Sequence, residues 1–309
     1  MVENANPPVQ STRHISVCIC TFRRPDLLLA LLRAVARQDT HGRFTYSLVV
    51  VDNDKDASAR TAVDNFRAEG LLATVYAVEP EQNISLARNR ALSMAEGEFV
   101  ALIDDDEIPG STWLATLLDA IDRYRADGVL GPVLARFSQP PPSWVSAGGF
   151  FDRPTHATGE VLDWMHTRTG NALLRRSLFP AGAMWFDPSF GRGGEDRDLF
   201  RRLMPLGHVF VWCNEAAVHE IVLPHRWKRS VLLKRALLRG KMALNTPDGH
   251  GLGIAKSIIA VPAYALALPF LLFAGQRYFM ADLIKLCDHL GKLLACCGID
   301  PVREKYVGG

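Results

Sequence analysis

The feature that most constrains the fold is a regular alternation of short apolar runs with longer helical patterns between residues 14 and 137. The apolar runs are rich in β-branched residues, as strands are, and the segments between them have helical length and spacing. Such an alternation predicts right-handed βαβ units and a Rossmann-like, mostly parallel central sheet with helices on both faces. The fold class expected is α/β. The expected strands are 15–20, 47–53, 72–78, 98–104 and 128–137, and the expected helices 26–38, 56–69, 84–95 and 112–125.

The length of 309 residues, 48% of them hydrophobic, suits one large domain or one domain with a small appendage. We expect a disordered lead-in over residues 1–13, an α/β domain over 14–240 and a C-terminal helical, membrane-associating region over 241–309. The periodicity weakens after residue 137. The net charge of +2 gives no indication of a nucleic-acid partner, and the N-terminus lacks the apolar stretch of a signal peptide.

The C-terminal region contains 19 residues without a charge, 257–275, which is close to the ~20 needed to cross a bilayer. The preceding stretch 226–241 has seven Lys and Arg residues, which favours the cytoplasmic side of a membrane. Residues 279–298 are amphipathic at helical spacing. These segments predict a membrane span, a hairpin or an interfacial anchor, and two core helices of a soluble domain are the alternative.

Polar side chains stand where three of the expected strands end. Thr21 and Arg23 follow the first, Asp52 ends the second, and the run Asp104 to Asp106 ends the fourth. Ligands of parallel sheets bind at this edge. Adjacent carboxylates repel one another unless a cation lies among them, and Mg²⁺ or Mn²⁺ commonly takes one or two carboxylates with phosphate oxygens. Asp104 and Asp106, two apart on a strand, would face one such ion; a solvated charged turn is the alternative.

Asp52 and three further side chains have both a functional and a structural interpretation. Asp52 can accept a hydrogen bond from a base or ribose, or form a turn. Arg88 lies on a helix that opens near Ile84, where free N–H groups attract an anion, or it belongs to a solvated basic face. Asp196 opens another helix and can serve as a general base or as an N-cap. His219 can bind a metal or fill a structural position.

These residues, in this order, resemble glycosyltransferase family 2 with the GT-A fold. The likeness covers residues 14 to 225, and within the family it is closest to bacterial exopolysaccharide glucosyltransferases of the succinoglycan type through 168-RTGNALLRR-176 and 192-RGGEDRD-198. The matching stretches are 17-VCICTFRRPDLL-28, 49-VVVDND-54, 83-NISLARNRAL-92, 98-EFVALIDDDE-107, 194-GEDRDLF-200 and 218-VHE-220.

The resemblance implies inverting transfer from a nucleotide-diphosphate sugar, usually a UDP-sugar such as UDP-glucose, with Mg²⁺ or Mn²⁺ as the cofactor. By position, the residues implied to contact the donor are Thr21 and Arg23 at the nucleotide, Asp52 at the uracil, Arg88 at the diphosphate, and Asp104 and Asp105 near the ribose. The implied metal ligands are Asp104, Asp106 and His219. Asp196 would take the proton from the acceptor hydroxyl. The metal would neutralise the leaving diphosphate, so no protein acid is required.

One departure from the family bears on the product. Processive members have a Gln-x-x-Arg-Trp motif, whereas here Leu223 stands three residues before Arg226-Trp227. We therefore expect one sugar per acceptor, and a polyprenyl-diphosphate-linked saccharide as that acceptor, at the cytoplasmic face of a bacterial inner membrane. A protein or a lipid A-type glycolipid is an alternative acceptor.

Two other functions compete with this interpretation. A nucleotidyltransferase would also combine an α/β sheet with metal-binding acids, but it usually has a glycine-rich loop after the first strand, and residues 20–26 contain no glycine. A catalytically degenerate GT-A subunit of a polysaccharide assembly complex is the non-enzymatic alternative, and the presence of every expected acid argues against it.

Overall fold

The computed structural model describes residues 13–191, 193–245 and 251–302, which form two compact units. Unit 1 comprises the chain up to residue 132 together with 155–189 and 196–218, and unit 2 comprises 133–154, 190–195 and the chain from 219 onward. The expected lead-in 1–13 lies outside the described residues except for Arg13, which begins the first strand. The expected boundary at residue 240 stays a prediction.

The centre of unit 1 is a seven-stranded sheet with the order β3-β2-β1-β4-β8-β6-β9. β1 is parallel to β2 and β4, β2 is parallel to β3, and β6 is parallel to β9. Within this sheet only β8 runs antiparallel to its neighbours, so the expected mostly parallel sheet is confirmed. The strands are β1 (Arg13–Thr21), β2 (Phe44–Asp52), β3 (Thr74–Val78), β4 (Phe99–Ile103), β6 (Gly128–Leu130), β8 (Asn171–Arg175) and β9 (Phe210–Trp212).

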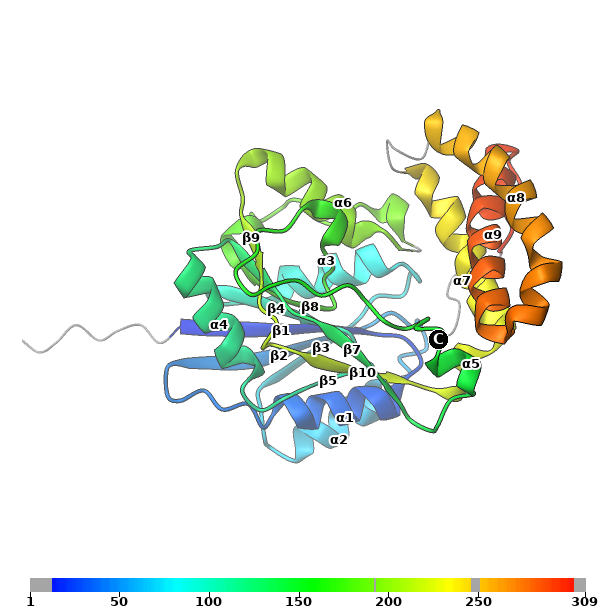
Figure 1. The fold of residues 1–309 in the computed structure, drawn as a ribbon. Helices are drawn as coiled ribbons and strands as arrows, with labels where there is room; N and C mark the ends of the chain where they lie inside the picture. Colours follow the sequence, from blue (N-terminus) through cyan, green and yellow to red (C-terminus); the bar gives the residue numbers. More distant parts are fainter. Residues whose placement is uncertain (1–12, 192, 246–250, 303–309) are drawn as a thin grey trace, which may run out of the picture. The chain divides into compact units, whose positions relative to one another are not determined.

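Helices cover both faces of this sheet, as expected from the alternation (Figure 1). Because successive strand residues face opposite ways, Cys18, Val49 and Leu102 pack on one face with Ala87 and Ala91 of α3. α6 contributes to the same core, whereas Figure 1 shows α1 and α2 on the other side of the sheet. The helices of unit 1 are α1 (Pro25–Val35), α2 (Arg60–Ala68), α3 (Ile84–Met94), α4 (Trp113–Tyr124) and α6 (Glu195–Leu203).

Asn171 fastens α4 to β8 at the centre of unit 1. Its Oδ1 accepts a hydrogen bond from the indole Nε1 of Trp113, and its Nδ2 donates to the carbonyl oxygens of Pro132 and Ala216 at 3.0 and 2.7 Å. A buried amide is tolerated in a core when its polar atoms are satisfied in this way. β8 was missing from the expected strands because it lies in the region where the periodicity is weak.

The single strand expected over 128–137 is wrong. β6 ends at Leu130, and β7 (Val133–Phe137) begins after Gly131 and Pro132, in unit 2. A Cβ atom on Gly131 would lie 2.5 Å from the carbonyl oxygen of Ala216, so the chain passes closer to its neighbours here than a side chain would allow. Proline cannot donate the hydrogen bond that a continuing strand requires.

In the described part of unit 2, two paired strands, β7 and β10 (Val218–Val222), combine with four helices. Its core brings together Val145, Phe151, Val222, Trp227 and Leu232. The helices are α5 (Ser143–Ser146), α7 (Arg229–Met242), α8 (Leu252–Ala274) and α9 (Gln276–Cys296). The remaining short elements of the chain are β5 (Glu107–Pro109) and the 3₁₀ turns η1 (Trp164–His166), η2 (Arg176–Leu178), η3 (Pro188–Phe190), η4 (Met204–Leu206), η5 (Pro224–Trp227) and η6 (Ala243–Asn245).

The C-terminal hydrophobic helical tail is confirmed. α9 packs along both α7 and α8, and it approaches α7 closely at Gly240 and Gly291, where an added Cβ would meet carbonyl oxygens at 1.9 and 2.1 Å. α8 is the one helix of the described residues that is long and apolar enough to cross a membrane, by length and composition. Only 6% of its apolar window is buried, which does not fit a core helix of a soluble domain.

Candidate functional site

The carboxyl ends of β1, β2 and β4 meet at one edge of the unit 1 sheet, as the sequence predicts. Thr21 pairs with Asp52 in the parallel register of β1 and β2. β4, however, ends at Ile103, and Asp104, Asp105 and Asp106 lie in the turn that leads to β5. Strand alternation therefore does not reach the aspartates, and the turn decides where each carboxylate points.

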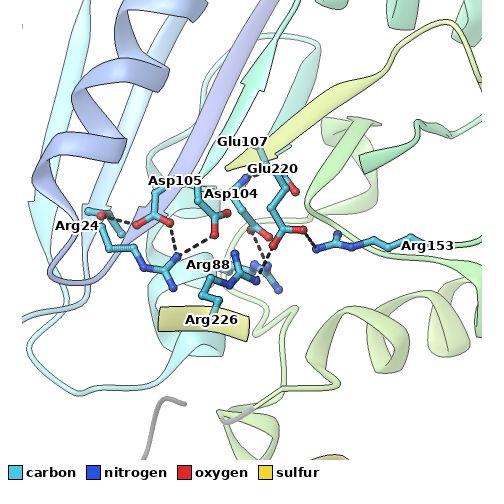
Figure 2. Close-up of polar contacts among 10 residues, drawn as sticks. Arg24, Arg88, Asp104, Asp105, Glu107, Arg153, Glu220 and Arg226 are labelled. Carbon is cyan, nitrogen blue, oxygen red and sulfur yellow. Dashed lines mark hydrogen bonds and ion pairs between the residues drawn. The ribbon is translucent and has the colours of Figure 1, made fainter. Parts of the chain in front are cut away.

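Arg24 joins two of the three aspartates, and it was not among the predicted site residues. Its Nη1 donates to Asp105 Oδ1 at 3.0 Å and to Asp106 Oδ2 at 3.2 Å, while Thr21 Oγ1 donates to the other oxygen of Asp105 at 2.7 Å (Figure 2). Asp105 and Asp106 are buried. The block of like charge is thus partly neutralised by a residue at the start of α1.

Burial opposes the ionised forms of both partners in this pair. Burial raises the pKa of Asp105, and the charge of Arg24 with the hydrogen bond of Thr21 offsets only part of that rise. Burial also acts to lower the pKa of Arg24, but the charges of Asp105 and Asp106 outweigh it and raise that pKa overall. Each partner therefore favours the charged form of the other, against the effect of burial.

Asp104 is the most accessible of the three aspartates, with 45% of its side chain exposed. Arg88 Nη2 lies 3.3 Å from its Oδ1, and the guanidinium of Arg88 also lies over the ring of Phe186. The backbone N–H of Asp104 donates to Glu107 Oε2 at 3.0 Å. A Cβ on Gly170, the residue before β8, would lie 2.8 Å from Glu107 Oε1 and 3.0 Å from Asp104 Oδ2. Only glycine lets the chain pass this close to the acidic turn.

Asp52 is fully buried and serves as an acceptor for three protein groups. Its Oδ2 accepts hydrogen bonds from the backbone N–H of Ala59 at 2.7 Å and from the hydroxyl of Tyr76 at 3.0 Å, and its Oδ1 accepts one from the N–H of Asp54. Burial raises its pKa, and these hydrogen bonds act in the opposite direction. Asp52 therefore fixes the loop that follows β2, and its contact with a base stays a prediction.

Arg23 lies at the same edge with most of its side chain exposed. Its Nε donates to Asp54 Oδ2 at 2.9 Å, and this hydrogen bond lowers the pKa of Asp54 despite its burial. Arg23 has φ of 54°, in the left-handed region that non-glycine residues seldom adopt. The surrounding fold must hold this strained backbone conformation. The guanidinium itself is exposed and can contact a ligand.

The start of α3 differs from the expectation of free N–H groups for an anion. Oδ1 of Asn83 accepts hydrogen bonds from the N–H groups of Ser85 and Leu86, at 3.0 and 3.3 Å, so the helix is capped by its own N-cap residue. Arg88, one turn further on, remains the cationic group of this helix that contacts the aspartates.

Asp196 and His219 belong to other elements than the acidic turn. Asp196 lies in the first turn of α6, where its Oδ1 accepts a hydrogen bond from the N–H of Arg197. His219 is an exposed residue of β10 and belongs to unit 2. Among the described residues no three His, Cys, Asp or Glu side chains form a group that would hold a metal by themselves. The metal assignments therefore stay predictions.

Unit 2 contains a buried ionic cluster that the sequence did not predict. The carboxylate of Glu220 accepts hydrogen bonds from Arg226 on one oxygen and Arg153 on the other, both at 2.6 Å (Figure 2). Burial acts to raise the pKa of Glu220, but the charges of the two arginines outweigh it and lower that pKa. Burial, together with repulsion from the charge of Arg226, lowers the pKa of Arg235 to about 10.

Comparison with known sequences agrees with the motifs of the acidic edge. The model of the family described as glycosyl transferase family 2 matches residues 16–181. The chain is 37% identical over 254 residues to the succinoglycan biosynthesis protein ExoM of Rhizobium meliloti (strain 1021), with 80% of each chain covered. It is 25% identical over 227 residues to the hyaluronan synthase of Pasteurella multocida, of which it spans 23%.

Comparison with solved structures confirms the GT-A fold. A mannosyltransferase from Pyrobaculum calidifontis, in complex with GDP-Man and Mn²⁺, superposes with a TM-score of 0.61 at 19% identity, covering 94% of this chain and 90% of the other. TarS residues 1–349 of S. aureus, in complex with UDP, gives a TM-score of 0.53 at 17% identity and covers 92% of each chain. At such identities the likeness concerns the fold alone.

Proposed function

The chain belongs to glycosyl transferase family 2 and is a glycosyltransferase, and from this premise we propose that it transfers one sugar, with inversion, from a UDP-sugar such as UDP-glucose to a lipid-linked saccharide in exopolysaccharide biosynthesis. The observation that carries the proposal is the acidic turn after β4. There Asp104 presents an accessible carboxylate, while Arg24 and Arg88 hold its surroundings in place. The relative that acts in succinoglycan biosynthesis supports the class of product.

The donor set at this turn fits a hard divalent cation. Asp104 and Asp106 offer carboxylate oxygens, the ligands that Mg²⁺ and Mn²⁺ prefer, and such ions commonly complete their coordination with phosphate oxygens and water. Two carboxylates are therefore enough protein ligands for an ion that arrives with a diphosphate. When bound, the metal would neutralise the charge that develops on the leaving diphosphate. His219 as a third ligand stays a prediction.

The other residues of the edge would hold the nucleotide. We assign Thr21 and the exposed guanidinium of Arg23 to the nucleotide pocket, and Arg88 to the diphosphate, where its second function would be to orient Asp104. Asp105 is buried, so its contribution would be to position the turn. Asp52 would act on the uracil side, and the hydrogen bonds to Ala59 and Tyr76 indicate that it shapes this pocket.

Asp196 is assigned as the general base. A carboxylate in the first turn of a helix is stabilised in its ionised form by the helix dipole. Ionised, it can accept the proton of the acceptor hydroxyl as that oxygen attacks the anomeric carbon. The hydrogen bond from the N–H of Arg197 occupies Oδ1, which leaves Oδ2 of this partly exposed side chain to take the proton.

The acceptor assigned is a polyprenyl-diphosphate-linked saccharide at the cytoplasmic face of the membrane. α8 supports a membrane location because it is a long apolar helix with little of its surface buried. The missing glutamine of the processive motif supports addition of one sugar only.

The experiment is a transfer assay with the purified full chain, UDP-sugars, Mn²⁺ or Mg²⁺, and a lipid-linked acceptor, beside a titration of UDP. Asp196→Asn should reduce kcat by about 10²-fold or more while the Kd for UDP changes by less than about twofold. Asp119→Asn, on the exposed face of α4, is the matched control and should keep full activity.

Two outcomes would contradict the proposal. Full activity of Asp196→Asn removes Asp196 as the base. A folded protein that binds no nucleotide and transfers no sugar would indicate the degenerate assembly subunit instead.

A further inference from the structure

The surface of α8 is divided lengthwise into two faces. One is a stripe of partly or fully buried residues with the three- and four-residue spacing of helix packing, and it faces α9. Ser257 Oγ lies 3.0 Å from Nδ1 of His289, and the ring of Tyr264 stacks on that histidine. The opposite face is apolar and exposed, and its large side chains are Leu252, Ile258, Ile259, Leu266, Phe270, Leu272 and Phe273.

The helix that packs against α8 is unsuited to hydrocarbon. α9 includes Asp282, Lys285, Asp288, His289 and Lys292. At ~35 Å, α8 is long enough to cross a bilayer, but α9 lies along it and would enter the bilayer as well. Ionised side chains at that depth are costly unless they line a protein interior or a water-filled cavity.

α7 strengthens this argument because it is tied to α9. Arg239 makes two hydrogen bonds of 3.1 Å to Asp288, and the backbones of the two helices approach closely at Gly240 and Gly291. α7 contains five Lys and Arg residues and no acidic residue. A spanning α8 would draw this basic helix toward the membrane interior, whereas an α8 lying flat leaves α9 and α7 on the water side (Figure 1).

The charge of this helical region indicates which kind of surface it meets. Residues 228–245 and 251–302 contain ten Lys and Arg against three Asp, although the whole chain has a net charge of only +2. Lys256 and Arg277, both exposed, bracket the uncharged run of α8 at its two ends. A second copy of the chain on this face would bring like charges together, whereas anionic lipid headgroups would complement them.

We propose that unit 2 is a monotopic membrane anchor: α8 lies in the plane of an anionic phospholipid surface, with its exposed apolar face in the headgroup and acyl boundary, and does not cross the bilayer. This deepens the proposed function, on which it rests for the membrane location. The helix would insert Leu266, Phe270 and Phe273, while Lys256 and Arg277 contact lipid phosphates. Such an anchor would hold the enzyme at the surface where a lipid-linked acceptor is found.

The first test is flotation of the full chain with vesicles of phosphatidylcholine alone or with about 30% phosphatidylglycerol. We expect binding to the anionic vesicles that weakens at about 0.5 M salt, because headgroup attraction is screened. Phe270→Glu with Phe273→Glu should reduce binding by about tenfold or more. Leu206→Glu is the matched control, because it places a charge on an equally exposed apolar side chain of unit 1, and it should bind as the unchanged protein does.

The second test measures depth. A cysteine is placed at position 252, 266 or 273, one position at a time, in a protein whose partly or fully exposed cysteines Cys20, Cys287, Cys296 and Cys297 are changed to alanine. The added cysteine carries a fluorophore, and its quenching by lipid-borne quenchers reports its depth in the anionic vesicles. All three positions lie on the exposed face. An in-plane helix gives the same shallow depth at all three, whereas a spanning helix puts position 266 near the bilayer centre.

Three results would overturn the proposal. One is unchanged vesicle binding by the double glutamate variant, and another is a deep position 266 between two shallow ends. The third is a dimer in analytical ultracentrifugation that the double variant dissociates, which would assign the face to a second copy. UDP affinity is measured on the unchanged protein and on every variant. An unchanged protein that binds UDP but does not float with anionic vesicles rejects this anchor alone. An unchanged protein that floats but binds no UDP rejects the proposed function.

Discussion

The guanidinium of Arg24 holds the carboxylate of Asp105 at 3.0 Å across 81 residues of sequence, at the edge where β1 and β4 end. The same nitrogen reaches Asp106, so one side chain from the start of α1 organises the turn that is proposed to receive the metal and the diphosphate. Burial disfavours the charge on each partner. Arg24 acts to lower the pKa of Asp105, and Asp105 acts to raise the pKa of Arg24, so each favours the charged form of the other.

Replacing Arg24 should therefore destabilise the protein more than an exposed arginine would. Arg24→Met keeps most of the volume but leaves Asp105 buried without its cation, and we expect the free energy of unfolding to fall by about 3 kcal/mol. Denaturant titration at neutral pH measures this. Arg33→Met, which removes an exposed pair with Glu69, is the control and should change little. Equal losses in the two variants would show that Arg24 has no special role.

Gly170→Ala should impair the donor site while lowering the free energy of unfolding less than Arg24→Met does. Its Cβ would press on Glu107 Oε1 and Asp104 Oδ2, at 2.8 and 3.0 Å, and so displace the accessible carboxylate. We expect the metal-dependent affinity for UDP to fall by about tenfold, which calorimetric titration measures directly. Gly110→Ala, where a Cβ meets nothing within 4 Å, is the matched control and should bind UDP normally. Normal binding by Gly170→Ala would separate this turn from the donor site.

The parallel edge and its acidic turn were predictable because both leave local signals. Apolar runs that end in Asp52 and Asp104 place the acids at the carboxyl ends of neighbouring strands whatever the detailed packing. Arg24 leaves a weaker signal in the sequence. It stands between Arg23 and Pro25 at the start of a helix, and nothing local distinguishes it from a solvent-exposed arginine. Only the pairing of β1 with β4 brings it to Asp105.

The parts that could not be predicted depend on contacts between distant segments. Arg153 and Glu220 are 67 residues apart, and the turns that bring them together have no periodic pattern. The division of 128–137 into β6 and β7 follows from the close approach of Gly131 to Ala216, which is a property of packing and not of the local sequence. The burial of Asp52 likewise depends on Tyr76 of the neighbouring strand.

Asp52→Asn distinguishes a structural role from direct contact with the base. An amide presents one oxygen in place of two, so its NH₂ group must face either the N–H of Ala59 or that of Asp54. We expect a loss of about 2 kcal/mol in the free energy of unfolding, together with weaker UDP binding. Asp39→Asn, at an exposed turn, is the control and should change neither quantity. Weaker UDP binding at full stability would instead indicate that Asp52 contacts the base.

The Glu220 cluster should make stability depend on pH in the acidic range. The folded state lowers the pKa of Glu220, because Arg153 and Arg226 outweigh the effect of burial. A group of this kind stabilises the fold above its unfolded pKa of about 4.3, and its contribution is lost as the pH falls through the folded value. Glu220→Gln should be less stable by about 3 kcal/mol at neutral pH, because Arg226 loses this buried carboxylate.

The measurement is the free energy of unfolding of both proteins in denaturant at a series of pH values below neutral. The difference between them should stay constant down to a pH of about 5 and then shrink as Glu220 becomes protonated in the unchanged protein. Glu69→Gln, which removes an exposed partner of Arg33, is the control and should follow the unchanged protein closely at every pH. If Glu220→Gln and the unchanged protein lose stability in parallel through the acidic range, the cluster is not the source of the pH dependence.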